Sequence, residues 1–261
     1  TTLTAGAHAG TDSPVSDEES PFRDRDPIPN SQAEELLRNG DIDVLGQMPW
    51  SSNTTLLCDV VHGDQIIQAV YKPHRGERPL WDFPDGLYLR EVACYQLAKS
   101  IGWDLVPPTV LIDGPVGPGS LQLFIPCNFE EHYLTLHNEP QFLAAFQKLT
   151  AFDFVANSTD RKSGHVLLGK DGHIWAIDNG LSFHAEFKLR TVLWDFAGEP
   201  IPDDIRTDLS TFVDVGLGDA LIDLLDDDDE VEAALERAGT LISRGRFPTD
   251  PTGRRWPWPL V

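Results

Sequence analysis

Cysteines, basic residues and long apolar runs are scarce in this chain. Cys58, Cys94 and Cys127 are its only cysteines among 261 residues, and none of them forms a CxxC pair. An odd number with this spacing argues against a disulfide framework or a structural zinc site, and we expect reduced thiols. No stretch approaches the roughly 18 apolar residues of a membrane span. The first residues also lack the basic-then-apolar layout of a signal peptide, so we expect a cytoplasmic protein.

Positive charge is the second shortage. The chain has 20 Lys and Arg against 42 Asp and Glu, for a formal net charge of −22. A surface this negative repels nucleic acids and anionic membrane leaflets. We therefore expect no nucleic-acid partner, consider a membrane partner improbable, and expect any anionic ligand to need a local pocket.

The composition suits a folded core. Hydrophobic residues make up 41% of the chain and aromatic residues 9%, which are ordinary values for a globular protein. A length of 261 residues fits one large domain or two intimate lobes. Residues 1–30 are rich in small, polar and proline residues, and we expect a flexible or draped segment there.

Residues 31–126 are predicted to form a β-rich N-lobe. A capping-box pattern at Ser31 begins a short helix that ends near Gly40. Apolar periodicity and turn residues then predict strands at 54–61, 65–71, 106–112 and 121–125, a loop at 73–86 and a helix at 87–101.

Residues 127–244 are predicted to form a mainly helical C-lobe, and residues 245–261 an extended tail. The expected elements are helices at 141–156, 205–213, 220–225 and 231–243, with two short strands at 166–168 and 174–177. The fold class is thus α+β, a two-lobed architecture like that of an atypical protein kinase. A ligand cleft is expected between the lobes.

Three polar groups of the C-lobe are expected to meet at this cleft. Asp160 and His165 lie in a polar loop before the first short strand, and Asp178 follows the second strand directly. Phosphoryl transfer needs a carboxylate for the attacking hydroxyl and ligands for a divalent metal ion. Lys72, at the end of an N-lobe strand, could reach the phosphates, and Glu91 on the next helix could pair with it.

Six segments resemble the phosphatidylinositol 3-/4-kinase superfamily, in particular its type II phosphatidylinositol 4-kinases and the actinobacterial proteins related to them. They span residues from about 50 to 200, most of the expected folded chain. The segments are Ala69–Pro73, Tyr88–Glu91, Val106–Thr109, Gly119–Ile125, Asn157–Arg161 and Ala176–Phe183.

The resemblance implies an ATP-dependent kinase that uses Mg or Mn. Lys72 would bind the α- and β-phosphates with Glu91 as its brace, and Asp160 would be the catalytic carboxylate. Lys72 and Arg161, which follows Asp160, are also assigned to the catalytic residues, and His165 and Asp178 would be metal ligands. The implied ATP-binding residues also include a phosphate-covering loop, Ser51, Ser52, Asn53 and Thr54, and a hinge beside adenine, Phe124, Ile125 and Pro126.

Three features depart from that pattern. The family usually has asparagine where this chain has His165, and imidazole favours manganese or zinc over magnesium. The covering loop lacks glycine, which makes close backbone approach to phosphate harder. Residues 74–86 contain no cysteine, whereas type II lipid kinases carry a lipidated cysteine-rich insert there, and this weakens the case for a lipid acceptor.

Three hypotheses follow from the sequence. The chain is an active kinase for a lipid, small-molecule or protein acceptor, or it is a pseudokinase that binds nucleotide or metal without transfer. The third hypothesis is an acidic interaction protein whose motif matches are accidental. The acceptor and the oligomeric state are open at this point.

Overall fold

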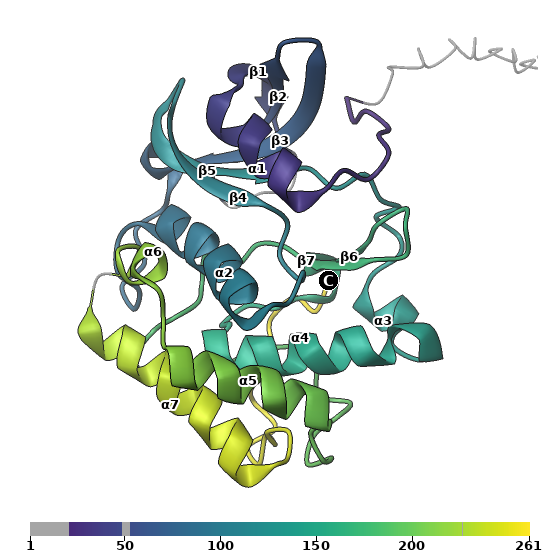
Figure 1. Ribbon diagram of the computed structural model, residues 1–261, viewed down its shortest axis with the longest axis vertical. Helices are drawn as coiled ribbons and strands as arrows, with labels where there is room; N and C mark the ends of the chain where they lie inside the picture. Colours follow the sequence, from purple (N-terminus) through teal and green to yellow (C-terminus); the bar gives the residue numbers. More distant parts are fainter. Residues whose placement is uncertain (1–20, 49–52, 226) are drawn as a thin grey trace, which may run out of the picture.

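The computed structural model describes residues 21–48, 53–225 and 227–261. An upper, β-rich lobe lies above a mainly helical lobe (Figure 1). The N-lobe contains α1 (Asn30–Asn39), β1 (Asp41–Gln47), β2 (Leu56–His62), β3 (Gln65–Pro73), α2 (Leu87–Ile101), β4 (Thr109–Gly114) and β5 (Gly117–Leu123). The C-lobe contains α3 (Tyr133–Leu136), α4 (Leu143–Ala156), β6 (Val166–Leu168), β7 (Ile174–Ala176), α5 (Asp203–Val215), α6 (Asp219–Ile222) and α7 (Asp228–Arg244). The predicted α+β, two-lobed fold class is confirmed.

The N-lobe sheet is antiparallel throughout, with strand order β1-β2-β3-β5-β4. The predicted hairpin is β2–β3, where His62 pairs with Gln65 across a turn that contains Gly63 at φ 60°. Strand β1 was not predicted from the sequence, because this edge strand is almost wholly exposed and has an irregular register between Val44 and Gly46. It therefore lacks the apolar alternation by which a strand is recognised.

Helix α2 has the predicted bounds, and both of its ends have a clear cause. At its start, Glu77 accepts hydrogen bonds from the backbone N–H groups of Gly86, Leu87 and Tyr88, which satisfies donors that have no partner inside the helix. At its end, Gly102 adopts φ 83° and donates its N–H to the last turn. The helix carries Glu91 and packs against β4 and β5.

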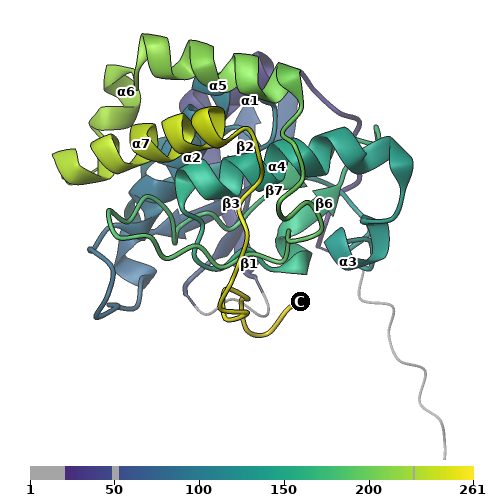
Figure 2. The same ribbon diagram turned by 90° about the horizontal axis from the view of Figure 1, so that it is seen from below.

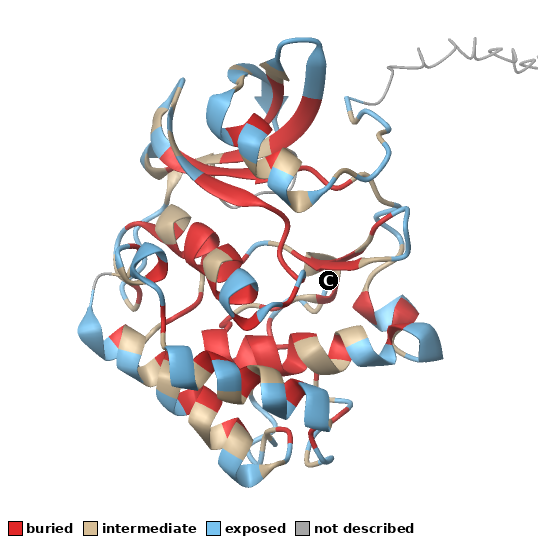
Figure 3. Cartoon of the chain, in the orientation of Figure 1, coloured by how far each residue is buried: buried red, intermediate tan, exposed pale blue. Residues whose placement is uncertain are grey.

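Two hydrophobic cores join the lobes. The larger core contains α2 together with α4, α5 and α7, so an N-lobe helix is anchored in the C-lobe. The smaller core, between the sheet and α1, includes Leu167 of β6 and Trp175 of β7, so a C-lobe hairpin packs under the N-lobe. Figure 3 shows the C-terminal half of α4 and much of α2 as buried. Because each lobe contributes an element to the core of the other, the residues that follow β7 in the C-lobe are held in a fixed position relative to β3.

The predicted N-terminal segment 1–30 is described only from residue 21. There, Arg23 pairs with Asp59, and the Phe22 ring stacks on Phe124 with centroids 5.1 Å apart. At the other end, residues 245–261 contain no helix or strand and cross the lower face of the molecule (Figure 2). Leu260 accepts a hydrogen bond of 2.7 Å from the N–H of Ser163, so the tail reaches the loop that carries Asp160.

Candidate active site

A cavity of about 300 Å³ lies between the lobes. Its residues come from the sheet, from the connection after β5, and from the segments around β6 and β7. They are Met48, Thr55, Val70, Lys72, Gln122, Leu123, Phe124, Ile125, Phe129, Gly164, His165, Leu167, Ile177 and Asp178.

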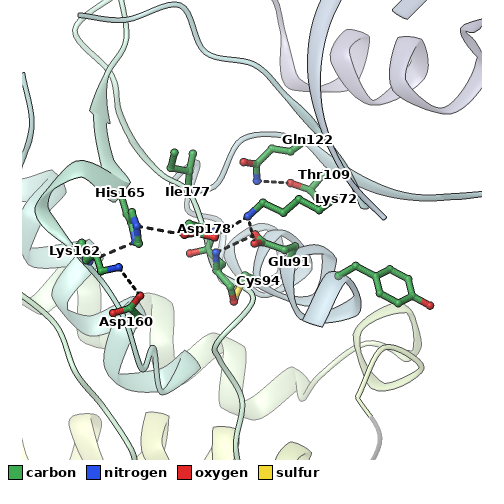
Figure 4. Close-up of polar contacts among 12 residues, drawn as sticks. Lys72, Glu91, Cys94, Thr109, Gln122, Asp160, Lys162, His165, Ile177 and Asp178 are labelled. Atoms are coloured by element: carbon green, nitrogen blue, oxygen red, sulfur yellow. Dashed lines mark hydrogen bonds and ion pairs between the residues drawn. The ribbon is translucent and has the colours of Figure 1, made fainter. Parts of the chain in front are cut away.

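Lys72 joins the two lobes at this cavity (Figure 4). Its ammonium forms an ion pair with Glu91 and lies 2.8 Å from the Asp178 Oδ1 atom. Burial alone would lower the pKa of Lys72, but Asp178 and Glu91 outweigh burial and hold the pKa above its ordinary value. Lys72 is therefore a permanent cation between two carboxylates, the Glu91 side chain that the sequence named as its partner and the Asp178 side chain, whose contact with Lys72 the sequence did not predict.

Of the two carboxylates that contact Lys72, Asp178 is the one that lines the cavity. Its side chain is 53% exposed, whereas that of Glu91 is 3% exposed. The charge of Lys72 is the main cause that lowers the pKa of Asp178. Asp178 is thus ionised at neutral pH and available to a metal ion.

His165 lies beside Asp178, with 3.3 Å between its Nε2 and the Asp178 Oδ2. Burial lowers the pKa of His165 to about 4, so the imidazole is neutral at physiological pH. The Nδ1 atom accepts a long hydrogen bond of 3.4 Å from the N–H of Lys162. This contact assigns the proton to Nε2, which donates to Asp178 in this arrangement.

Asp160 lies on the other side of His165 and forms an ion pair of 3.0 Å with Lys162 (Figure 4). Burial is the first cause that raises the pKa of Asp160, and the negative charge of Asp178 adds to it. The same causes that raise its pKa also make Asp160 a better proton acceptor.

The metal ligands predicted from sequence fit a divalent ion. Two neighbouring ligands of an octahedral Mg²⁺ or Mn²⁺ at about 2.1 Å are about 3 Å apart, close to the separation of His165 Nε2 and Asp178 Oδ2. Metal binding through Nε2 requires its proton to leave or move to Nδ1. An imidazole and a single carboxylate suit manganese better than magnesium.

The predicted hinge only partly lines the cavity. Phe124 and Ile125 face it, whereas Pro126 lines a separate, smaller cavity together with Trp175. Val70, Leu167 and Ile177 supply the apolar walls that a purine ring needs.

The predicted phosphate-covering loop lies between β1 and β2. Ser51 and Ser52 fall outside the described residues. Asn53 accepts a hydrogen bond from the N–H of Arg78, and the Thr54 N–H donates to the Gly76 carbonyl. These contacts attach the end of the loop to the β3–α2 connection, and neighbouring Thr55 lines the cavity.

Arg161 lies behind the cavity. Its side chain is 1% exposed and forms an ion pair with Asp153, which was not among the site residues predicted from the sequence. Lys162 was also missed. The sequence could have indicated a role for Lys162, because a lysine two positions after a catalytic carboxylate can form an ion pair with it. Lys162 forms such a pair with Asp160.

The described residues have a two-lobed, kinase-like fold. A solved structure of a Hydra Fam20 protein with sugar matches 82% of this chain and 87% of its own chain, with a TM-score of 0.50 and 14% identity. The Helicobacter pylori proinflammatory kinase CtkA matches 79% of this chain and 93% of its own, with a TM-score of 0.48 and 12% identity. At such identities, the likeness to the Fam20 structure concerns the fold alone.

Among known sequences, Protein Rv2133c of Mycobacterium tuberculosis is 35% identical over an alignment that covers 86% of this chain and 94% of that protein. The chain belongs to the family of that protein. No protein-family model matches the chain. Within the described residues, every helix is too short or too polar to cross a bilayer.

Proposed function

We propose that this protein is an ATP-dependent phosphotransferase that uses a divalent metal ion. One observation carries the proposal: the Lys72 ammonium lies between Glu91 and Asp178 at a cavity of about 300 Å³ between the lobes. Phosphoryl transfer depends on positioning and charge stabilisation, and a lysine–glutamate pair with a metal-binding carboxylate is its recurrent arrangement.

In this proposal, each polar group has one task. Lys72 binds the α- and β-phosphates, and Glu91 holds its ammonium in place. Asp178 and His165 hold the metal ion, which would neutralise charge on the phosphates. Asp160 orients the acceptor hydroxyl and takes its proton, while Lys162, 3.0 Å away, offsets charge on the transferred phosphoryl group.

The adenine is assigned to the apolar end of the cavity. Val70 would cover the ring from the N-lobe, and Leu167 and Ile177 would support it from the C-lobe. The backbone of Phe124 and Ile125 would face its polar edge, as the family resemblance implies. Asn53 and Thr54, with Ser51 and Ser52, would cover the phosphates.

The acceptor is an alcohol on a lipid, a small molecule or a protein. The motif resemblance to type II phosphatidylinositol 4-kinases favours a lipid, whereas the net charge of −22 opposes approach to an anionic membrane. A small-molecule or protein acceptor is compatible with both observations.

A second candidate function rests on His165. Because its Nε2–H faces Asp178 and its Nδ1 accepts from Lys162, the imidazole is held in a tautomer that cannot bind metal through Nε2. A pseudokinase would bind nucleotide in the cavity without transferring phosphate. Any transfer to an added acceptor or to the protein itself would eliminate this candidate.

Nucleotide binding and turnover test both candidates in one series of variants. We expect ATP with Mn²⁺ to bind the wild-type protein, Lys72→Met to weaken this binding at least about tenfold, and Asp160→Asn to retain binding but lose transfer. Lys99→Met is the matched control, because Lys99 forms an ion pair with Glu34 at an exposed site. Isothermal titration and ADP release provide the readouts. Equal affinity in Lys72→Met and wild type would overturn the proposal.

A further inference from the structure

We infer that Arg161, held by Asp153, is a positioning residue that fixes the metal-ligand segment 177–179 and, through it, Glu91. The inference rests on the proposed function for its meaning, and on a buried polar network for its geometry. Neither Arg161 nor Asp153 lines the cavity, so both would act through other residues.

The ion pair at the centre of this network is fully enclosed. Asp153, on α4, is 0% exposed, and Arg161 is 1% exposed. The Arg161 Nε atom lies 3.1 and 3.3 Å from the two Asp153 oxygens, and its Nη2 atom lies 3.0 Å from Oδ1. Ser158 and Thr191 each donate a hydroxyl to the same carboxylate at 2.9 Å. A buried ion pair with this many partners holds the guanidinium plane in a single orientation.

The Arg161 guanidinium forms hydrogen bonds with the residues on both sides of Asp178. Its Nη1 donates to the carbonyl of Ile177 at 2.7 Å, and its Nη2 donates to the side-chain oxygen of Asn179 at 2.6 Å. Asp178 itself has φ 57°, in the left-handed region that non-glycine residues rarely adopt. Such a conformation persists where the surroundings over-determine it, and Arg161 supplies two of those constraints.

The network continues into the N-lobe. The backbone N–H of Asn179 donates to the Glu91 Oε2 atom at 2.9 Å, and the other oxygen of Glu91 pairs with Lys72. Lys72 in turn contacts Asp178, which belongs to the segment that Arg161 binds. The contacts therefore form a closed ring that runs from Arg161 through Asn179, Glu91 and Lys72 to Asp178. A change at Arg161 is therefore transmitted to the residues of both lobes that would hold the metal–nucleotide complex.

A buried ion pair can also serve stability alone, and the chain offers variants that separate the two roles. Arg161→Lys retains the positive charge but lacks the planar fork that reaches Ile177 and Asn179 together. Asn179→Ala leaves the ion pair with Asp153 and the contact with the Ile177 carbonyl intact. It removes the second contact between Arg161 and the segment, together with the hydrogen bond that the Asn179 side chain donates to the Ala176 carbonyl. The control Thr191→Val removes one hydrogen bond to Asp153 and the one that Thr191 accepts from the Leu193 N–H, and it changes none of the groups that Arg161 contacts directly.

The first readout is amide hydrogen exchange of the protein without ligand. We expect Arg161→Lys and Asn179→Ala to lower the protection of the backbone amide of residue 179, relative to its intrinsic exchange rate, by about tenfold or more, and Thr191→Val to leave it near the wild-type value. Equal protection of this amide in all four proteins would overturn the inference. Because this readout needs no nucleotide, it is independent of the proposed function.

The second readout is the Mn²⁺ concentration that gives half-maximal ATP binding. We expect it to rise about tenfold in Arg161→Lys and Asn179→Ala and to stay at the wild-type value in Thr191→Val. A rise of the same size in Thr191→Val would reduce Arg161 to a stability role. If wild-type protein showed no Mn²⁺-dependent binding while the exchange result held, the proposed function would fail and the positioning of segment 177–179 would stand.

Discussion

At the scale of single residues, the neighbours of each ionisable group at the cavity decide its charge. Lys72 stays charged because two carboxylates face it, and Asp178 stays ionised because Lys72 faces it. His165, in contrast, is neutral because burial outweighs the attraction of Asp178. The cavity thus combines the fixed cation of Lys72, the fixed anion of Asp178 and the uncharged imidazole of His165.

The neutral state of His165 predicts how stability depends on pH. In the unfolded chain a histidine titrates near its ordinary pKa of 6.5, whereas in the folded protein the pKa is about 4. Between these values the unfolded state binds more protons, so stability is full above pH 6.5 and falls as the pH drops toward 4. We expect this residue to contribute a loss of at most about 3 kcal/mol across that window.

Urea unfolding of wild type and His165→Asn at pH 7.5, 6 and 5 measures this contribution. The difference in free energy of unfolding between the two proteins should shift in favour of His165→Asn as the pH falls. A difference that is constant with pH would show that His165 titrates normally in the folded protein.

Much of the candidate site could be predicted from sequence because short connections constrain it. Asp160, His165 and Asp178 lie within one loop–strand–turn–strand segment, and Lys72 ends a strand that sequence alternation identifies. The role of Arg161 could not be predicted in this way, because its partner Asp153 lies inside an apolar helix and the two meet only in the folded protein. Asp153 is the single acidic residue of the apolar helix α4, and this isolated charge was the one indication in the sequence that a buried basic partner exists.

At the scale of elements, α2 is held in place from below. Arg90 forms two hydrogen bonds, of 2.7 and 3.0 Å, with Glu230 of α7 and a third, of 2.6 Å, with the carbonyl of Ser182. Both charged side chains are at most 5% exposed. Because α2 also carries Glu91, this contact keeps Glu91 directed at Lys72.

Removing one partner of this ion pair should be costly. Arg90→Ala leaves Glu230 buried without its cation, and we expect the free energy of unfolding to fall by about 3–5 kcal/mol. The matched control is Arg206→Ala, whose pair with Asp203 is exposed and 3.8 Å long, and which should change stability by less than about 1 kcal/mol. Urea denaturation of the three proteins gives these values, and similar losses in both variants would contradict the account.

Elements with strong local signals could be predicted, and those with weak signals could not. Helix α2 has the expected bounds because its apolar face and Gly102 are local features. The edge strand β1 has exposed side chains and an irregular register, so only its pairing with β2 defines it. The four-residue helix α3 was missed because it is shorter than the periods on which helix prediction depends.

At the scale of the whole molecule, net charge is the dominant feature. A formal charge of −22 spread over the surface makes the folded state repel itself, and salt weakens that repulsion. We expect the melting temperature to rise when the salt concentration increases from about 10 to about 150 mM, as the Debye length falls from about 30 to about 8 Å.

Thermal melts in sodium chloride and in tetramethylammonium chloride measure this effect. Both salts should raise the melting temperature alike, since the effect is screening and not specific ion binding. A melting temperature that falls with either salt would mean that surface ion pairs outweigh the repulsion.

The central claim of the proposal is that the ion pair of Lys72 and Asp178 marks a nucleotide site between the lobes. A crystal structure with Mn²⁺ and a non-hydrolysable ATP analogue tests it most directly. The account predicts the triphosphate in the cavity, with Lys72 on its phosphates and an anomalous manganese peak at Asp178. A nucleotide bound elsewhere, or an empty cavity at saturating nucleotide, would contradict it.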